Sequence, residues 1–169
     1  VGSEMCIRDR HTVDKYLSTI TLNIQIMSKS TLPRLKALRD EMGKAGITAF
    51  IIPGTDPHQS EYYASHWAAR TWISGFDGSA GTAVVTTNQA GLWTDSRYFL
   101  QAAQQLEDSG FELFKEGLPD TPTIEQWLLT TLPQGATIAI DGTLFGASKA
   151  AAMKQNFESH GFRFVSDFT

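Results

Sequence analysis

Three short runs of this chain combine the residue types best suited to chemistry. Residues 71–82 read TWISGFDGSAGT, residues 92–102 read LWTDSRYFLQA, and residues 56–62 read DPHQSEY. The first two set charged or glycine-rich polar positions against large aromatic side chains. That mixture suits the wall of a pocket or an interface better than a plain hydrophobic core.

The glycine-rich run excludes three common catalytic motifs. Gly75, Gly78 and Gly81 do not have the spacing of a dinucleotide fingerprint, and no lysine lies nearby to make a phosphate loop. Asp77 stands two residues before Ser79, where a nucleophile elbow requires glycine. The glycines therefore indicate tight turns and close backbone approach, with the wall of a binding site as the alternative.

Arg97 is the strongest candidate for ligand contact. It lies between Asp95 and Tyr98, with further aromatic side chains on both sides. A guanidinium in such a setting can grip a carboxylate or a peptide carbonyl through its planar fork. The alternative on the residues alone is an internal ion pair with Asp95 or Asp77.

The histidines and the single cysteine predict no catalytic and no metal-ligating residue. His11, His58, His66 and His160 form no His-Glu-x-x-His motif and no other cluster with ligand spacing. Cys6 alone can form neither an internal disulfide nor a thiolate cluster, which favours a reducing compartment. His58 is a hydrogen-bonded structural residue, or it lines a substrate entrance or a subunit contact.

Composition bounds the class of protein. The chain has 169 residues, 41% hydrophobic and 19% charged, which is enough for one globular domain with a substantial core. The net charge is -4, without a dense basic stripe, so no nucleic-acid partner is expected. No apolar run is long enough to span a membrane.

The pattern of apolar residues, caps and breakers predicts an α/β fold, in which helices alternate with short strands. The fold class is a single domain with a mixed β-sheet and helices on its faces, and residues 80–87 and 90–93 form an antiparallel hairpin. Helices are predicted from Ser30 or Thr31 to Gly46, at 98–107, from Thr121 or Pro122 through 124–132, and at 148–160. Further strands are predicted at 47–53, 111–115, 137–140 and 162–165. Residues 55–65 are predicted to form a loop or a short helix.

The N-terminal residues are set apart from the domain. Residues 1–10 resemble translated sequencing adapter, and Met27 is a plausible start. Residues 1–27 are therefore expected to be a non-native or disordered extension, with residues 28–169 as the domain. The alternative is a genuine strand at 20–26, where isoleucine and leucine alternate with polar residues.

Four aromatic residues gather near the first and third runs: Tyr62, Tyr63, Trp67 and Trp72. Core packing explains most aromatic residues, but tyrosine and tryptophan are also favoured at interfaces because one end stays polar. An aromatic patch here fits a domain that docks against another domain or subunit.

The three runs, followed by DTPT at residues 120–123, occur in the order and with the gaps of a known family. From about Ser30 to its end, the chain resembles the N-terminal, creatinase/prolidase-type domain of cytosolic-type Xaa-Pro aminopeptidases (aminopeptidase P). The resemblance implies an enzyme of three domains, the last a catalytic pita-bread domain that this chain lacks. That domain would hold two Mn²⁺, so no cofactor is expected in residues 1–169, and this part alone is expected to be inactive.

The resemblance also implies site residues and partners. The arginine that matches Arg97 contacts peptide in the family, so Arg97 and His58 are the predicted substrate-binding residues. Ser96 replaces the family's usual glycine, and a glycine with positive φ at this position would make serine a source of strain. The implied substrate is a peptide with proline at position two, and the implied state is a cytoplasmic homodimer.

Three functions remain open on the sequence. The first is a non-catalytic N-terminal domain of a Xaa-Pro aminopeptidase, contributing to dimerisation and substrate binding. The second is a free-standing binding or dimerisation module without hydrolase activity. The third is an independent enzyme, which is the weakest because the sequence offers no nucleophile–base pair and no metal set.

Overall fold

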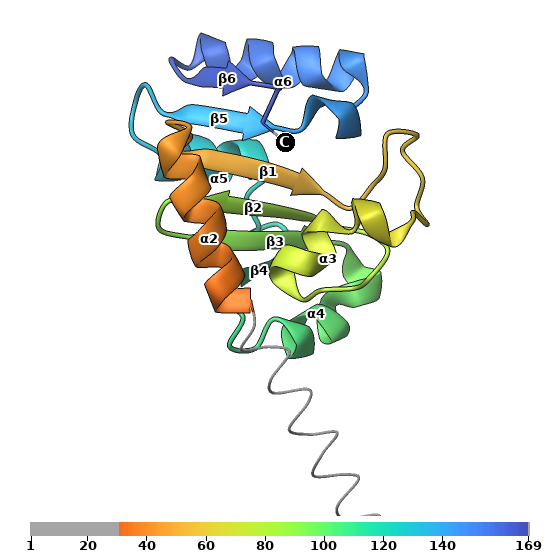
Figure 1. Cartoon of the computed structure of the whole chain (residues 1–169). Helices are drawn as coiled ribbons and strands as arrows, with labels where there is room; N and C mark the ends of the chain where they lie inside the picture. The colour runs from red at the N-terminus through yellow and green to blue at the C-terminus, as the bar shows by residue number, and fades with distance from the viewer. Residues whose placement is uncertain (1–30, 169) are drawn as a thin grey trace, which may run out of the picture.

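The computed structural model describes residues 31–168, which form one sheet with helices on both faces (Figure 1). The helices are α2 (Thr31–Lys44), α3 (Ala69–Ser74), α4 (Phe99–Gln105), α5 (Ile124–Thr131) and α6 (Ala147–Ser159). The strands are β1 (Ala49–Pro53), β2 (Thr82–Thr86), β3 (Ala90–Thr94), β4 (Glu112–Lys115), β5 (Thr137–Ile140) and β6 (Arg163–Val165). Short 3₁₀ turns lie at Ser65–Trp67, Ser96–Tyr98 and Gly142–Leu144. The predicted α/β class and mixed sheet are confirmed.

The sheet has the strand order β4-β3-β2-β1-β5-β6. Strand β2 runs antiparallel to both β1 and β3, whereas the β3–β4, β1–β5 and β5–β6 pairs are parallel. Five of the six strands therefore point the same way, and their carboxyl ends share one edge of the sheet. In open α/β sheets this edge is where ligands usually bind.

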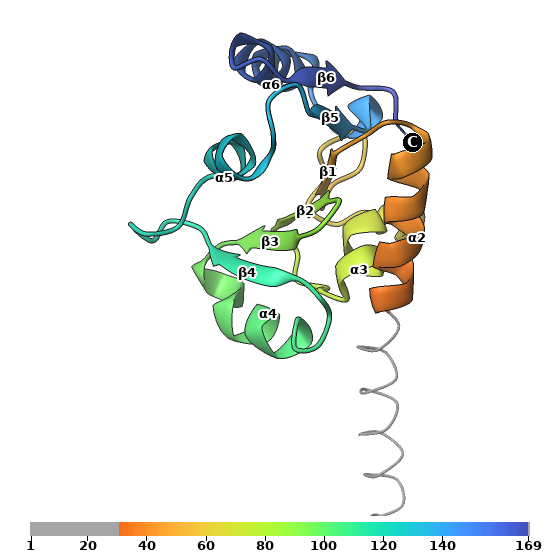
Figure 2. The same ribbon diagram turned by 90° about the vertical axis from the view of Figure 1, so that its left-hand side faces the viewer.

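Strand alternation divides the core into two layers. Ile51, Val84 and Trp93 face the layer that contains α5 and α6, while their chain neighbours Ile52 and Leu92 face the layer that contains α2, α3 and α4. Figure 2 shows these helices on opposite sides of the sheet. Because both faces are covered, β3 and β5 are buried along their whole length.

An aromatic cluster joins β3, β4 and α5. The Trp93 ring stacks on Phe114 with centroids 4.1 Å apart and meets Trp127 edge-on at 5.2 Å. The Trp93 indole N–H donates to the Pro122 carbonyl at 2.9 Å, so its one polar atom is satisfied. This bond fixes the segment before α5 against the sheet.

Most predicted elements are confirmed to within a few residues, with two corrections. Helix α5 is capped by Thr123 rather than by Thr121 or Pro122, because Thr123 and Gln126 form a reciprocal capping box. Helix α3 was not predicted, since it has only six residues, three of them apolar, before Gly75, the left-handed C-cap residue, ends it. The 55–65 segment is a loop that leads into the 3₁₀ turn at Ser65–Trp67.

The predictions for residues 1–27 concern residues outside those the structure describes, so the extension and the alternative strand at 20–26 stay predictions. Residues 31–168 contain no helix with the length and apolar character needed to cross a membrane.

The core can be tested with one substitution at two leucines. Leu128 on α5 is fully buried, whereas Leu100 on α4 is 85% exposed. Leu128→Ala should lower the free energy of unfolding by about 2–5 kcal/mol through lost burial and a residual cavity. Leu100→Ala should change it by less than about 0.5 kcal/mol. Urea denaturation measures both, and equal losses would contradict this assignment of the core.

Candidate functional site

A hollow of about 320 Å³ opens at the carboxyl-end edge of the sheet. Residues 53–55, 59–61, 79–82, 144, 145 and 149 line it, and it is called here the strand-end hollow. Its wall combines the end of β1, the loop after it, the start of β2, the segment after β5 and the first turn of α6. Segments distant in sequence thus meet where the fold class predicts a ligand site.

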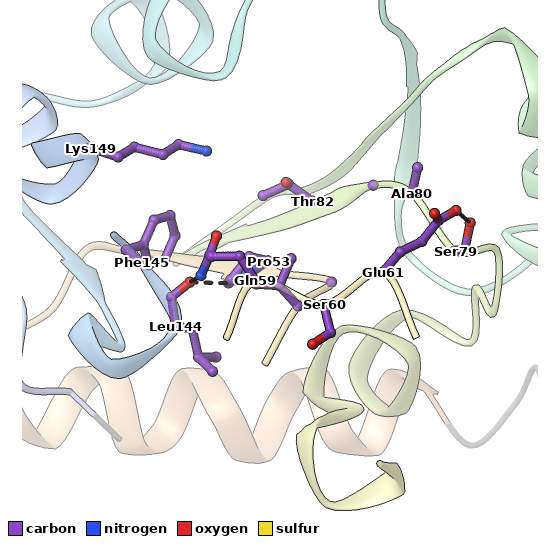
Figure 3. A pocket seen from close by; sticks show the side chains of 13 residues that line it. Pro53, Gln59, Ser60, Glu61, Ser79, Ala80, Thr82, Leu144, Phe145 and Lys149 are labelled. Carbon is purple, nitrogen blue, oxygen red and sulfur yellow. Dashed lines mark hydrogen bonds between the residues drawn. The ribbon is translucent and has the colours of Figure 1, made fainter. Parts of the chain in front are cut away.

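The charged side chains of the hollow stand apart from each other. Figure 3 shows Lys149 extending from α6 toward Thr82, while Glu61 and Ser79 lie at the opposite end. Phe145 provides an apolar surface near Lys149, whose amino group lies 5.6 Å from the ring centroid. None of the ion pairs formed among residues 31–168 involves Lys149.

At the Glu61 end, two hydroxyls and a carboxylate form a chain. The Ser79 hydroxyl donates to Glu61 Oε1 at 2.8 Å and lies 2.6 Å from the Tyr98 hydroxyl. A serine has one proton to give, so Tyr98 donates to Ser79. The serine oxygen is therefore held in place, and its contacts orient the carboxylate.

Arg97 lies beside this end of the hollow, on the 3₁₀ turn that follows β3. Its Nε and Nη2 donate to the Asp95 carboxylate at 3.1 and 2.8 Å, and Nη1 lies 3.8 Å from Glu61 Oε1. Hydrogen bonding to Asp95 raises the pKa of Arg97 above its ordinary value. The same contact lowers the pKa of Asp95, so both groups are charged at neutral pH.

The two explanations offered for Arg97 are thus compatible. Asp95 is the ion-pair partner, and Asp77 is not, because Asp77 accepts from Gln101 and Gln105 at 2.6 and 2.7 Å. Nη1 of the exposed guanidinium lies 3.8 Å from Glu61 Oε1, and contact with a ligand stays a prediction. Ser96 brings no left-handed strain, since within residues 31–168 only Gln59 and Asp108 have positive φ among non-glycine residues.

His58 does not join the residues that line the hollow. It is exposed, its backbone N–H donates to Asp56 Oδ1 at 3.0 Å, and no hydrogen bond holds its ring among the described residues. Asp56 also accepts from the Ser60 N–H, and these backbone bonds, Ser60 first, lower the pKa of Asp56. The structure brings Arg97 to the site's rim and leaves His58 on the neighbouring loop.

Gln59 ties this loop to the opposite wall. Its amide donates to the Leu144 carbonyl at 2.8 Å, visible in Figure 3, and its φ is 61°. A left-handed glutamine is uncommon and is held by surrounding contacts. Sequence analysis missed Gln59, because neither its strained backbone nor its distant partner leaves a pattern in the chain.

Arg70, a second residue that sequence analysis missed, lies behind Gly54 and Gly81 in the wall of the hollow. Arg70 is 1% exposed, and its guanidinium donates to the carbonyls of Gly78 and Gly81 and, at 3.4 Å, to the Tyr63 hydroxyl. It also lies over the Phe76 ring, 5.1 Å from the centroid. Burial lowers the pKa of Arg70, partly offset by Tyr63 and Asp77.

The glycines around Arg70 allow the close approach that was predicted. A methyl group on Gly54 would lie 2.6 Å from Arg70 Nη1, and one on Gly81 would lie 2.8 Å from the Trp93 carbonyl oxygen. Gly75 ends α3 in the left-handed conformation, with φ 78°. Gly81, and Gly54 from the loop after β1, also line the hollow, and the binding-wall interpretation stays a prediction.

No group of three or more histidine, cysteine, aspartate or glutamate side chains within residues 31–168 is arranged to hold a metal ion. The hollow presents one lysine, one glutamate, hydrogen-bonding groups and one aromatic surface.

Comparison with known proteins identifies the family. Residues 34–167 match the model of the creatinase/prolidase N-terminal domain, and the chain belongs to this family. It is 48% identical over 124 residues to Xaa-Pro aminopeptidase ApepP of Drosophila melanogaster, covering 70% of this chain and 20% of that protein. It is 46% identical over 128 residues to Xaa-Pro aminopeptidase 2 of Rattus norvegicus, covering 76% and 18%. The chain thus spans about a fifth of these relatives' length.

Solved structures agree with the sequence matches. The X-prolyl aminopeptidase of Caenorhabditis elegans, described as a cytosolic enzyme with a di-nuclear active site, superposes with a TM-score of 0.68 at 38% identity, over 71% of this chain and 20% of that one. An aminopeptidase P chain from Streptococcus thermophilus gives 0.60 at 21% identity, over 82% and 93%, and shows the shared fold.

The glycine contacts generate a stability test with a matched control. Gly54→Ala should destabilise the domain by about 1–3 kcal/mol, because the added methyl group overlaps the buried Arg70 guanidinium. Gly43→Ala in α2 adds the same methyl where nothing lies within 4 Å, and should be neutral or slightly stabilising. Urea denaturation compares the two, and a Gly54→Ala protein as stable as the parent would refute the close approach.

Proposed function

We propose that this chain is the non-catalytic N-terminal domain of a dimetal Xaa-Pro aminopeptidase, which removes the N-terminal residue before a proline. The family match and the identity to Xaa-Pro aminopeptidases from fly and rat support this proposal. The observation that carries it is the 48% identity over 124 residues, since the domain's own fold occurs in peptidases of several kinds. The substrate is a peptide with proline at position two.

In this proposal Arg97 contacts the peptide. Its Nε and Nη2 are occupied by Asp95, which holds the planar group in one orientation. The Nη1 edge then donates to a peptide carbonyl or carboxylate at the rim of the strand-end hollow. His58, exposed on the neighbouring loop, lines the approach to the same rim.

The domain also contributes to dimerisation in this proposal. Tyr62 is 84% exposed and Trp72 is 54% exposed, and both belong to the aromatic group singled out in the sequence. Arg34 lies 5.1 Å from the centroid of the Trp72 ring, which gives this surface a cation as well as aromatic area. Aromatic and arginine side chains are enriched in protein interfaces.

Two divalent metals, Mn²⁺ in the proposal, would activate the attacking water in a catalytic domain outside residues 31–168. The residues described here orient peptide and take no part in metal binding. A cytoplasmic location is proposed as well, supported by the description of the C. elegans relative as cytosolic.

The test uses a full-length enzyme that contains this domain. Arg97→Ala should lower kcat/KM for Xaa-Pro peptides by about tenfold or more, because a charge-assisted hydrogen bond to the peptide is lost. Arg163→Ala is the control, since Arg163 is an exposed arginine on β6, away from the hollow. Thermal unfolding should be nearly the same for both variants.

Unchanged kinetics for Arg97→Ala would contradict the peptide-contacting role. The alternative function is a free-standing binding module without hydrolase activity. The reading frame beyond codon 169 distinguishes the two: a catalytic domain there supports the proposal, and a stop codon supports the module.

A further inference from the structure

The strand-end hollow carries a positive charge that no residue of its own wall neutralises. Glu61 and Lys149 are the ionisable residues that line it. Glu61 accepts from Ser79 and lies 3.8 Å from Arg97, so its charge is already engaged. Lys149 takes part in none of the ion pairs found within residues 31–168.

A second cation lies directly behind the floor. The Arg70 guanidinium is 1% exposed, it forms no ion pair within the described part of the chain, and its Nε has no hydrogen-bond partner there. The Cβ position at Gly54 is 3.0 Å from this Nε and 2.6 Å from Nη1. Only glycine backbone therefore separates the buried charge from the hollow, and its field is weakly screened there.

The acidic residues near Lys149 do not pair with its amino group. Glu116 and Glu125 are the acidic residues of a neighbouring hollow, which shares Thr82 and Lys149 with the first. Burial, and then Asp95, raise the pKa of Glu116 above its ordinary value. Neither glutamate forms an ion pair with Lys149 in the described part of the chain, so the amino group keeps its donors for a ligand.

We propose that the strand-end hollow is a carboxylate subsite, in which Lys149 binds the carboxylate of a bound peptide and the charge of the buried Arg70, behind Gly54 and Gly81, attracts it without contact. This deepens the proposed function and rests on it, because a peptide is the ligand. Arg97 at the rim contacts one part of the peptide, and Lys149 at the far end binds its carboxylate. Phe145, beside Lys149, packs against apolar atoms of the peptide next to its carboxylate.

The experiment titrates the 169-residue chain with two peptides that differ by one charge, Ala-Pro-Ala and Ala-Pro-Ala-amide. Amide ¹H–¹⁵N shifts give the dissociation constants. The free acid should bind about tenfold more tightly than the amide, because only the acid offers Lys149 a charge-assisted bond. The shifts should concentrate at Gly54, Gly81 and Thr82, and the preference should shrink as salt is added.

Lys149→Gln should abolish the preference for the free acid. Lys154, on the same helix and also exposed to solvent, pairs with Glu158 at 3.9 Å, so Lys154→Gln should retain the preference. A third peptide, Ala-Pro-Asp-amide, moves the carboxylate to a side chain. Tight binding of this peptide would support a general carboxylate site, and its exclusion a site for the chain terminus.

Two results overturn the subsite. Equal affinity for the free acid and the amide would show that the peptide's carboxylate does not contribute to binding, and would not bear on the peptide contact at Arg97. A preference that survives in Lys149→Gln shows that the carboxylate binds elsewhere. Failure of the proposed function is seen separately, in the kinetics of the Arg97→Ala full-length enzyme.

Discussion

Arg70 places a guanidinium in the interior of the domain, where losing water is costly and no carboxylate forms an ion pair with it in the described part of the chain. The compensation comes from the carbonyls of Gly78 and Gly81, the Tyr63 hydroxyl and the face of Phe76. Each partner belongs to a segment that borders the hollow. The Arg70 side chain thus holds the glycine-rich loop and the loop after β1 together beneath the hollow.

The burial of Arg70 explains why glycine stands at positions 54 and 81. Backbone carbonyls can reach a buried guanidinium only if no side chain intervenes, and Gly54 and Gly81 leave that space. The loop is also held from the sheet side, because the Thr94 hydroxyl donates to the Ala80 carbonyl at 2.7 Å. With the loop held on both sides, Ser79 is positioned to orient Glu61, and Glu61 lies next to Arg97. The rim therefore depends on a cation that never contacts solvent.

The sequence predicted the parts of this fold that rest on local pattern. Strand-forming residues at 80–87 and 90–93, separated by Asn88 and Gln89, indicated the hairpin, and caps, apolar residues and breakers indicated α2, α4 and α6. Arg97 stood out because its neighbours Asp95 and Tyr98 lie beside it in the chain. Arg70, Gln59 and Lys149 could not be found this way, because their partners at Gly81, Leu144 and the hollow become neighbours only in the folded sheet. Helix α3 was not predicted for a related reason. Packing against α2 and the sheet stabilises this helix more than the helix propensity of its six residues does.

Hydrogen exchange of the glycine-rich loop, residues 75–81, in an Arg70→Met protein tests the role of the buried guanidinium most directly. Methionine keeps apolar bulk and removes every donor to the loop, while Arg70→Lys restores the charge without the planar fork. If Arg70 holds the loop, its amides should exchange at least about tenfold faster in both variants, while amides of β5 change only by the loss of global stability. Loop amides that exchange as slowly in Arg70→Met as in the parent protein would contradict the account.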